Sequence, residues 1–239
     1  MNDRLDKVLV DKGITDNRSQ AENYIKLGKV RVDEQVVKKP GSKTSKNAVV
    51  TLTTTKRYVS RGGFKLESVA HSLGLDFRNQ AVLDVGSSTG GFSDYALQHG
   101  ASKVIAVDIG TRQLAEALRT NTKIELHEQT DIKAIKKLST KINIVLIDVS
   151  FTSVRPVLTH LLNLVSPGCV IIAMVKPQFE VRDSFKHKGV IKNQTIRRKI
   201  FKDFEAWVKN KYKILDKADS GVAGEKGNLE RFYKLVVLV

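Results

Sequence analysis

Acidic side chains stand at or near the ends of three apolar runs that have the composition of buried strands. Asp84 lies in AVLDV, Asp108 ends KVIAVD, and Asp148 ends INIVLID. The first run continues into a glycine-rich turn, GSSTGG, and then into a segment that indicates a helix ending at Gly100. A strand, a tight turn and a helix in this order open at the edge where α/β sheets bind ligands. The three acids therefore mark a candidate ligand site.

The acid in the first run bears on the kind of ligand. The spacing of the turn is G-x-x-x-G-G, which differs from the G-x-G-x-x-G of dinucleotide-binding proteins. The Asp84 carboxylate would repel the pyrophosphate of a dinucleotide. S-adenosylmethionine has no phosphate and carries a sulfonium and an ammonium, so the acid favours it over NAD. The position of Asp108 at the end of the next strand suits a side chain that accepts hydrogen bonds from both ribose hydroxyls of an adenosyl group.

We therefore predict S-adenosylmethionine as the cofactor, with the glycine-rich turn around its methionine part and Asp108 on its ribose. Glycine-rich turns between a strand and a helix occur in many α/β proteins with different ligands, so the turn alone leaves other ligands open. The expected cofactor-binding residues of the turn and of the next strand end are Asp84, Gly86, Ser87, Thr89, Gly90, Gly91, Phe92, Asp108 and Ile109.

The composition indicates a globular protein with a polyanionic partner. The chain has 239 residues, 41% of them hydrophobic, enough for an α/β core and one small further domain. Its formal net charge of +16 suits a nucleic acid, with an anionic membrane surface as the competing explanation. The longest apolar run, residues 169–175, is too short to span a bilayer, and the start lacks the pattern of a signal peptide. We expect a cytoplasmic monomer.

Cysteine and histidine give no sign of a metal site. Cys169 is the single cysteine, so the chain has no internal disulfide, and its position at the head of an apolar run indicates a core residue. The five histidines are scattered, without an i, i+4 pair. We expect no metal.

The first 55 residues lack the alternation of strands and helices that follows them. Two short helical patterns, one of them ending before Gly28, precede three short strand patterns. Residues 1–60 hold 13 Lys or Arg against 7 Asp or Glu, although such an excess is usually only a solvated face. Residues 53–61 are polar and without periodicity. We therefore predict a small domain over residues 1–55, a linker over 56–62 and a larger domain over 63–239.

The larger domain is expected to be an α/β sheet that positions two lysines. A helix starts near Gly63, and Lys65 in its first turn opposes the helix dipole, so something other than helix stability holds that lysine. Lys176 follows the fifth predicted strand, and the proline after it keeps its backbone extended. The two last strands, near Ile214 and from Arg231, fit an antiparallel hairpin at the edge of the sheet.

The segment from Arg182 to Lys213 is strongly basic, with 11 Lys or Arg against 3 Asp or Glu. Part of it has the spacing of a helix whose apolar stripe indicates core packing. The basic side of that helix either touches RNA or is a solvated face, and the pattern leaves the two interpretations equal.

The basic amino-terminal segment resembles the S4 RNA-binding domain in RLDKVLVDKG, in NRSQAENYIKLGKVRVD and in the Pro40-Gly41 turn. The resemblance covers nearly all of residues 1–55. In that family a second basic residue often follows the serine, where this chain has Gln20. The resemblance implies that the residues facing RNA phosphates are Arg4, Arg18, Ser19, Gln20, Lys26 and Lys29.

Four further residues, Lys65, Asp148, Lys176 and Glu230, follow the Lys-Asp-Lys-Glu order of ribose 2′-O-methyltransferases of the FtsJ/RrmJ type. The segments SRGGFKL, DVGSSTGGFSD, LIDVSF, VKPQFE and GEKGNLE, behind an S4 domain, are similar to the TlyA family over essentially the whole chain. The implied fold is α/β: a Rossmann-like class I methyltransferase sheet, mostly parallel with an antiparallel edge strand, behind a small α+β S4 domain.

The resemblance also implies an activity and the roles of these residues. Members are cytoplasmic enzymes that methylate cytidine ribose in ribosomal RNA, and some carry the label haemolysin. Lys176 would activate the ribose hydroxyl, with Lys65 nearby lowering its affinity for a proton, while Asp148 and Glu230 orient the lysines and the ribose. Asp131 would contact the adenine, at a position where relatives often have asparagine. The competing interpretation of Lys176 and Asp148 is a structural ion pair.

Three functions compete at this point: a methyltransferase of ribosomal RNA, a non-catalytic RNA-binding or assembly factor on the same fold, and a secreted membrane-lytic protein. The third has the least support, because the sequence shows neither an export signal nor a long apolar segment. Loss of one of the four catalytic residues would favour the second, and all four are present.

Overall fold

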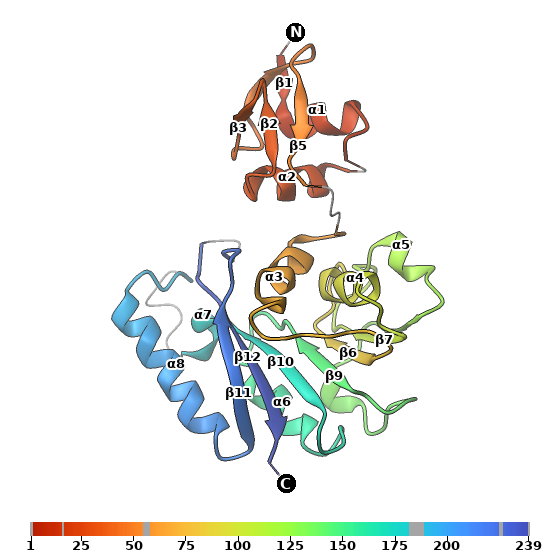
Figure 1. The fold of residues 1–239 in the computed structure, drawn as a ribbon, viewed down its shortest axis with the longest axis vertical. Coiled ribbons are helices and arrows are strands. Elements are labelled where there is room, and N and C mark those ends of the chain that lie inside the picture. The colour runs from red at the N-terminus through yellow and green to blue at the C-terminus, as the bar shows by residue number, and fades with distance from the viewer. Residues whose placement is uncertain (1, 16, 55–57, 182–188, 225–226, 239) are drawn as a thin grey trace. The chain divides into compact units, whose positions relative to one another are not determined.

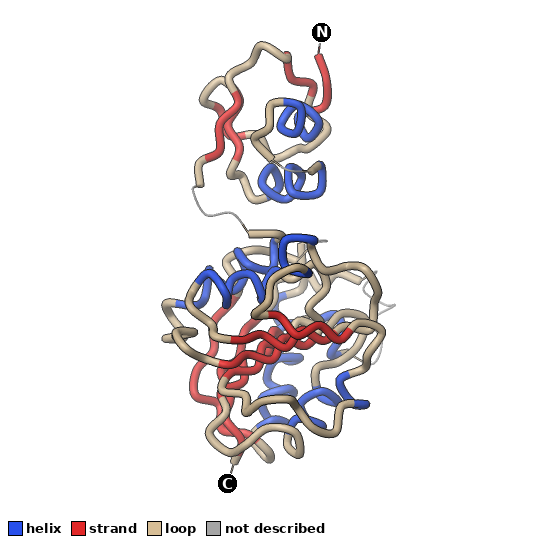
Figure 2. Tube along the Cα trace, turned by 90° about the vertical axis from the view of Figure 1, so that its right-hand side faces the viewer, coloured by secondary structure: helices blue, strands red, loops and turns tan. Residues whose placement is uncertain are grey.

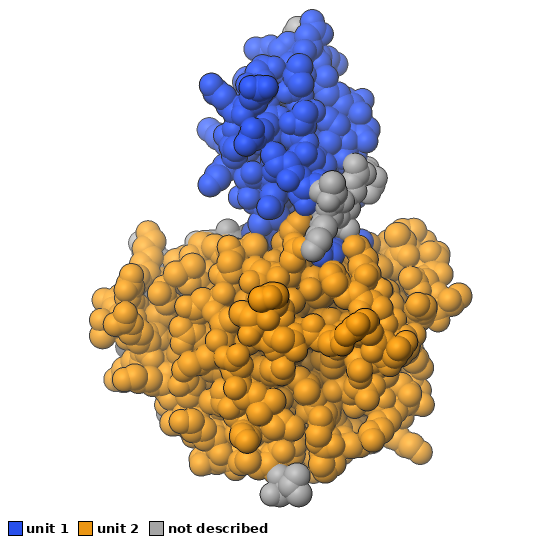
Figure 3. Space-filling view, viewed as in Figure 1, with its two compact units in different colours: residues 1–61 blue, residues 62–239 orange. Residues whose placement is uncertain are grey.

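The computed structural model describes residues 2–15, 17–54, 58–181, 189–224 and 227–238 (Figure 1). The chain divides into two compact units, Met1–Arg61 and Gly62–Val239 (Figure 3). Residues 56 and 57 of the predicted linker, and residue 55 before it, fall outside the described residues. In the part of the chain that is described, no helix is long and apolar enough to cross a membrane.

The smaller unit consists of two helices and two small antiparallel sheets. Its helices bury an apolar stripe that includes Leu5, Leu9 and Ile25, which are all fully inaccessible to solvent. Its sheets have the strand orders β1-β4 and β3-β2-β5, and β1 and β4 were not predicted because three polar residues give no strand signal. The elements are β1 Asn2–Arg4, α1 Leu5–Asp11, α2 Arg18–Lys26, β2 Val30–Val32, β3 Gln35–Val36, β4 Lys43–Ser45 and β5 Val50–Leu52.

The larger unit is a seven-stranded sheet with the order β11-β12-β10-β9-β6-β7-β8. Its elements up to the fourth strand are α3 Arg61–Ala70, β6 Ala81–Val85, α4 Gly91–Gln98, β7 Lys103–Val107, α5 Glu116–Arg119, β8 Ile124–His127, the 3₁₀ helix η1 Ile132–Ala134 and β9 Ile144–Ile147. The remaining elements are α6 Arg155–Leu161, β10 Val170–Val175, α7 Pro177–Glu180, α8 Gln194–Val208, β11 Tyr212–Asp219 and β12 Arg231–Val237. The α/β class and the mostly parallel sheet predicted from the sequence are confirmed.

Two details differ from the sequence-based expectation. The strand that is antiparallel to both of its neighbours is β12, which lies between β10 and β11 rather than at the edge. The edge strand β11 pairs with β12 alone. The pattern of two final strands shows a hairpin but does not show which of them pairs with the rest of the sheet. In addition, α3 begins at Arg61, two residues before Gly63, because Arg61 and Gly62 add no apolar periodicity to the first turn.

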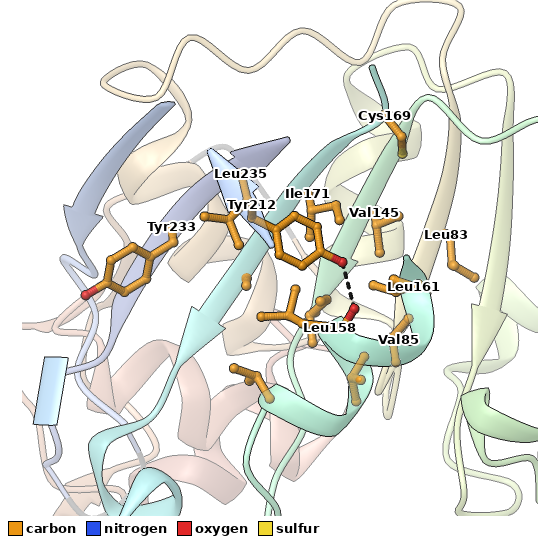
Figure 4. Close-up of a cluster of buried hydrophobic side chains, with 14 of the residues drawn as sticks. Leu83, Val85, Val145, Leu158, Leu161, Cys169, Ile171, Tyr212, Tyr233 and Leu235 are labelled. Atoms are coloured by element: carbon orange, nitrogen blue, oxygen red, sulfur yellow. Dashed lines mark hydrogen bonds between the residues drawn. The ribbon is translucent and has the colours of Figure 1, made fainter. Parts of the chain in front are cut away.

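The core of the larger unit lies between the sheet and the helices on its two faces (Figure 2). On one face, side chains of β9 and β10 such as Val145 and Ile171 pack with α6 and α8. The Tyr212 ring is buried in this cluster, and its hydroxyl donates a hydrogen bond of 2.6 Å to the carbonyl of Leu158 (Figure 4). On the other face Phe92 of α4 contacts Phe232 of β12, with ring centroids 5.9 Å apart. Both faces are therefore covered, which explains the continuous apolar runs of the central strands.

The topology sets the position of the site. From β6 the chain moves in one direction across the sheet to β7 and β8, and then returns to β9 on the other side of β6. The loops after β6 and β9 therefore diverge at the carboxyl edge, which is the switch point where sheets of this kind bind ligands.

Replacing Tyr212 by phenylalanine should lower the free energy of unfolding of the larger unit by about 1–2 kcal/mol, because the buried Leu158 carbonyl loses its hydrogen bond. Denaturant unfolding followed by fluorescence reports on this unit, since Trp207 is the single tryptophan. Lys213→Gln, at the adjacent exposed position, is the control. Equal unfolding midpoints for the two variants would contradict the prediction.

Candidate active site

The glycine-rich turn after β6 passes directly against the end of β9. Gly86 has a φ of +82°, and a Cβ atom built on it would lie 2.7 Å from the backbone oxygen of Asp148. Gly90 has a φ of +93° and caps α4, and a Cβ there would lie 2.4 Å from the Leu118 side chain. Only glycine allows this path at both positions, because of the backbone angles and the lack of space.

Asp84 is fully buried beneath this turn. Its Oδ2 accepts hydrogen bonds from the backbone amide (3.0 Å) and the hydroxyl (2.6 Å) of Ser93 in α4. Its Oδ1 is also buried and has no hydrogen-bond partner among the described residues. Burial raises the pKa of Asp84 to about 7, although the hydrogen bonds from Ser93 oppose the shift. A buried carboxylate oxygen with its acceptor capacity unused suits a cationic or hydrogen-donating ligand.

Asp108 is held between two turns at the end of β7. Its Oδ2 accepts a hydrogen bond of 2.8 Å from the amide of Ser88, and its Oδ1 one of 2.7 Å from the amide of Gly110. Ile109 next to it is 74% exposed, which is unusual for a large apolar side chain. Asp131 lies after β8, where it caps η1 and forms an ion pair of 3.1 Å with Lys133.

The other residues of the turn follow the same path. Ser87 is buried and its hydroxyl has no hydrogen-bond partner among the described residues, while Thr89 and Gly86 are partly exposed. Gly91 and Phe92 are buried in the first turn of α4. The Phe92 side chain is buried in the core against Phe232, so it supports the turn from the core side.

Strand register brings the predicted catalytic residues to one edge. Ile147 pairs with Val85 on one side and with Ala173 on the other, so Asp148 emerges between the turn after β6 and the end of β10. Val175 pairs with Arg231, and Lys176 and Glu230 each lie one residue beyond that pair. Lys65 comes to the same place from α3.

Each predicted catalytic lysine forms an ion pair with a predicted catalytic acid. Lys176 Nζ lies 2.6 Å from Asp148 Oδ1, and Lys65 Nζ lies 2.6 Å from Glu230 Oε2. The lysine side chains are 8% and 10% exposed, and that of Glu230 is 3% exposed. Lys176 also donates a hydrogen bond of 2.6 Å to Ser150 Oγ. Charges so little exposed to water persist only because they are paired.

Several residues around Lys176 were not predicted from the sequence. One is Ser150, which receives the lysine's hydrogen bond. Another is Phe151, which is 93% exposed with a φ of +63°, and its ring centroid lies 5.5 Å from that of Phe179. Phe179 in turn lies 6.0 Å from Lys176 Nζ. The signal was their place in LIDVSF and VKPQFE, next to the predicted catalytic residues.

Glu180, a further residue of this kind, ties α7 to the loop after β9. Its carboxylate is 1% exposed and accepts hydrogen bonds from Ser153 Oγ (2.8 Å), the Val154 amide (2.9 Å) and Arg155 Nε (3.2 Å). The Arg155 guanidinium also contacts Asp203 of α8 at 2.6 Å. The segments that carry Lys176 and Asp148 are therefore linked by a buried charge network.

In the smaller unit, a buried carboxylate organises two of the predicted RNA-facing residues. Asp6, whose side chain is 0% exposed, accepts hydrogen bonds from Arg4 at 2.7 and 3.0 Å and from Arg18 at 2.9 Å. The hydrogen bonds from Arg4, with a further one from Arg18, lower the pKa of Asp6 to about 2, against the effect of burial. The Arg4 and Arg18 side chains remain 47% and 58% exposed, so both guanidinium groups are anchored yet accessible.

The other predicted RNA-facing residues lie on or just after α2. Ser19 and Lys26 are exposed, and Gln20 and Lys29 are partly exposed. Lys26 forms an ion pair of 3.0 Å with Glu22. Among the described residues, no group of three or more His, Cys, Asp or Glu side chains is arranged to hold a metal ion.

Comparison with known proteins assigns the chain to a family. The model of the FtsJ-like methyltransferase family matches residues 58–235, and that of the S4 domain matches residues 3–50. The 23S rRNA (cytidine-2′-O)-methyltransferase TlyA of Campylobacter jejuni is 40% identical over 179 residues, which cover 74% of this chain and 70% of that protein. The chain belongs to the TlyA family of FtsJ-like methyltransferases. The resemblance inferred from the sequence motifs is confirmed.

Other members of the family bear a different description. Hemolysin A of Brachyspira hyodysenteriae is 32% identical, over 98% of this chain and all of that protein. A solved structure from Streptococcus thermophilus, described as a hemolysin, covers 99% of this chain and 88% of that chain, with 31% identity and a TM-score of 0.76. The family and the fold imply a methyltransferase that depends on S-adenosylmethionine.

Replacing Asp6 by asparagine should destabilise the smaller unit by about 1–3 kcal/mol, because Arg4 and Arg18 lose charged hydrogen bonds. Amide hydrogen exchange in α1 measures this locally, with Asp11→Asn at an exposed position as the control.

Because Asp6 has a lowered pKa, the stability of the smaller unit in the wild-type protein should depend on pH. A carboxyl whose pKa is lower in the folded state stabilises that state above its unfolded pKa of about 4, and this contribution is lost as the pH falls through about 2. Protection of α1 that stays constant from pH 5 to pH 2, or that is the same in both variants, would show that Asp6 is not the anchor.

Proposed function

We propose that this protein transfers a methyl group from S-adenosylmethionine to the 2′-hydroxyl of a cytidine ribose in ribosomal RNA. The observation that carries the proposal is the convergence of Lys65, Asp148, Lys176 and Glu230, from four separate segments, at the edge that holds the Asp84 turn. The activity named for the Campylobacter jejuni relative supports the substrate and favours RNA of the large subunit as the first to test.

The residues of the turn fit the cofactor. Asp84 Oδ1 has unused acceptor capacity for the ammonium of the methionine part, the path of Gly86 and Gly90 lets a ligand approach the backbone, and Asp108 lies ready for the ribose hydroxyls. The exposed Ile109 side chain provides an apolar surface for the adenine, with Asp131 at its edge. When bound, the cofactor supplies an activated methyl group on its sulfonium.

Lys176 is the residue that takes the proton from the ribose hydroxyl. A lysine must first be neutral to accept a proton, and the Asp148 carboxylate at 2.6 Å provides a place for the proton that Lys176 gives up. Exclusion of water by bound RNA would favour this neutral pair over the ion pair. Ser150 fixes the direction of the amine, and Lys65 with Glu230 holds the ribose from the other side.

The smaller unit captures RNA while the larger unit carries out the chemistry. The residues that contact RNA phosphates are Arg4, Arg18, Ser19, Gln20, Lys26 and Lys29. Hydrogen bonds to Asp6 hold the two arginines in position on this surface. The exposed Phe151 ring, which contacts Phe179, suits stacking on an unstacked base. Because ribosomal RNA is the substrate, the place of action is the cytoplasm.

Replacing Lys176 by alanine should reduce single-turnover methylation of ribosomal RNA by at least about a hundredfold, the usual size of a general-base effect. Cofactor binding, measured by calorimetry, and RNA binding should stay near wild type, because neither uses this amine. Lys192→Ala, at an exposed position in the same unit, is the control. Near wild-type methylation by the Lys176 variant would assign the proton transfer to another group and leave the pair with Asp148 a structural one.

Cofactor affinity should rise with pH. Burial raises the pKa of Asp84 to about 7, and a cationic ligand binds the carboxylate form, so the dissociation constant should fall as the pH rises from about 6 towards 8, where the amine of the ligand begins to lose its own charge. Calorimetric titration with S-adenosylmethionine across this range measures the effect. Asp84→Asn should bind weakly with no such dependence, whereas Asp76→Asn, at an exposed position, should behave as wild type. A flat profile for the wild type would remove Asp84 from the ammonium contact.

A further inference from the structure

Helix α8 has one apolar side and one cationic side. Its apolar side, which includes Phe204 and Val208, is buried in the core of the larger unit. At 100° per residue, the solvent side carries four cations that we call the α8 cationic face. These are Arg198, Lys199, Lys202 and Lys209, the last being the C-cap, and all four are exposed.

The two acids of α8 are both engaged with cations outside this face, although at 100° per residue Glu205 lies only about 20° around the helix from Arg198. Asp203 contacts Arg155 at 2.6 Å, and Glu205 contacts Lys217 at 2.8 Å and accepts a hydrogen bond of 2.9 Å from the Tyr233 hydroxyl. Both acids therefore neutralise groups at the flanks of the helix. Within the described part of the chain, no ion pair is formed by any member of the α8 cationic face, which distinguishes it from a mixed solvated surface.

Two pairs of cations on this face have a spacing that opposes the helix, although Lys199 is four positions from Asp203 and Lys209 is four positions from Glu205. Arg198 and Lys202 are four positions apart and Lys199 and Lys202 are three apart, so like charges face each other on adjacent turns. Exposed lysines on two other helices have acidic partners, since Lys26 of α2 pairs with Glu22 and Lys7 of α1 pairs with Asp3. A polyanion along α8 would relieve the repulsion, and the face extends for about 16 Å at a rise of about 1.5 Å per residue.

The structure also joins this helix firmly to the catalytic segments. Arg155 contacts Asp203 of α8 and the buried Glu180 of α7, and its guanidinium lies 5.4 Å from the centre of the Trp207 ring. α7 directly follows Lys176, and α8 lies beside β11 at the margin of the sheet (Figure 1). RNA held on α8 would therefore keep a constant position relative to the reacting groups.

We propose that the α8 cationic face is a second RNA-binding surface, which contacts backbone phosphates of the substrate and belongs to the catalytic unit rather than to the smaller unit. The proposal rests on the proposed function, since it takes ribosomal RNA as the polyanion. Its role is to align RNA that the smaller unit has captured, so its loss should affect RNA affinity and leave the chemical step and cofactor binding intact.

The test compares two triple variants that remove the same charge. R198Q/K199Q/K202Q alters the α8 cationic face, and the control K136Q/K137Q/K141Q alters three exposed lysines between η1 and β9. Binding of protein-free 23S ribosomal RNA is measured at several salt concentrations, together with single-turnover methylation at saturating RNA and calorimetric cofactor binding. Thermal unfolding establishes that both variants are folded, and R198K/K199R/K202R is included because it keeps the charge.

The α8 variant should bind the RNA roughly tenfold more weakly than the control. The slope of log K against log salt should fall by about 2, because each phosphate that is no longer neutralised removes about 0.7–0.9 from the slope. The charge-conserving variant should keep the wild-type slope. Equal affinity and equal slope for the α8 variant and the control would overturn the proposal. Because binding is measured separately from methylation, a wild-type protein that binds this RNA without methylating it would overturn the proposed function but still allow the α8 comparison.

Discussion

The candidate active site depends on one close approach, that of the turn after β6 to the end of β9. The backbone of Gly86 passes so near the Asp148 carbonyl that even a methyl group there would lie 2.7 Å from it. This approach occurs at the switch point of the sheet, where the chain leaves β6 in one direction and returns to β9 in the other. It sets the region predicted to hold the cofactor directly beside the residue that pairs with Lys176.

Paired buried charges hold the reacting groups in place. Lys176 with Asp148 and Lys65 with Glu230 join β10 to β9 and α3 to the start of β12, and Glu180 with Arg155 joins α7 to the next loop. Removing one member of such a pair leaves an uncompensated charge in a region with little water, which is costly. The same pairs that orient the site therefore also hold its segments together, and this coupling limits which substitutions the edge tolerates.

In both units, carboxylates engage cationic side chains near a basic surface. In the smaller unit a buried Asp6 anchors two arginines whose guanidinium groups remain half exposed. In the larger unit the acids of α8 are engaged at the flanks of the helix, and its cations are left facing solvent. In both cases carboxylates hold cationic side chains, or the helix that carries them, in a defined arrangement. Binding of a polyanion would then cost less conformational entropy.

The class of fold, the family and the residues of the candidate site could be predicted from the amino-acid sequence, because these depend on local features. Apolar runs that end in acids, a glycine turn of fixed spacing and a lysine before a proline are all visible in the chain, and strong periodicity located the central strands. The short strands β1 and β4 were missed because three polar residues pair only in the folded unit.

Which side chains contact each other follows from the packing of whole elements and could not be predicted from the sequence. The register of β10 with β9 and β12 put Lys176 beside Asp148, with Lys176 and Glu230 each one residue beyond the pair of Val175 and Arg231, and α3 brought Lys65 to Glu230. We predicted that Lys65 lowers the affinity of Lys176 for a proton. The structure shows that each of the two lysines has an acid as its ion-pair partner. The contacts of Ser150, Glu180 and Asp6 join residues separated by 12 to 27 positions in the chain, and no local pattern encodes such distances because they follow from how whole elements pack.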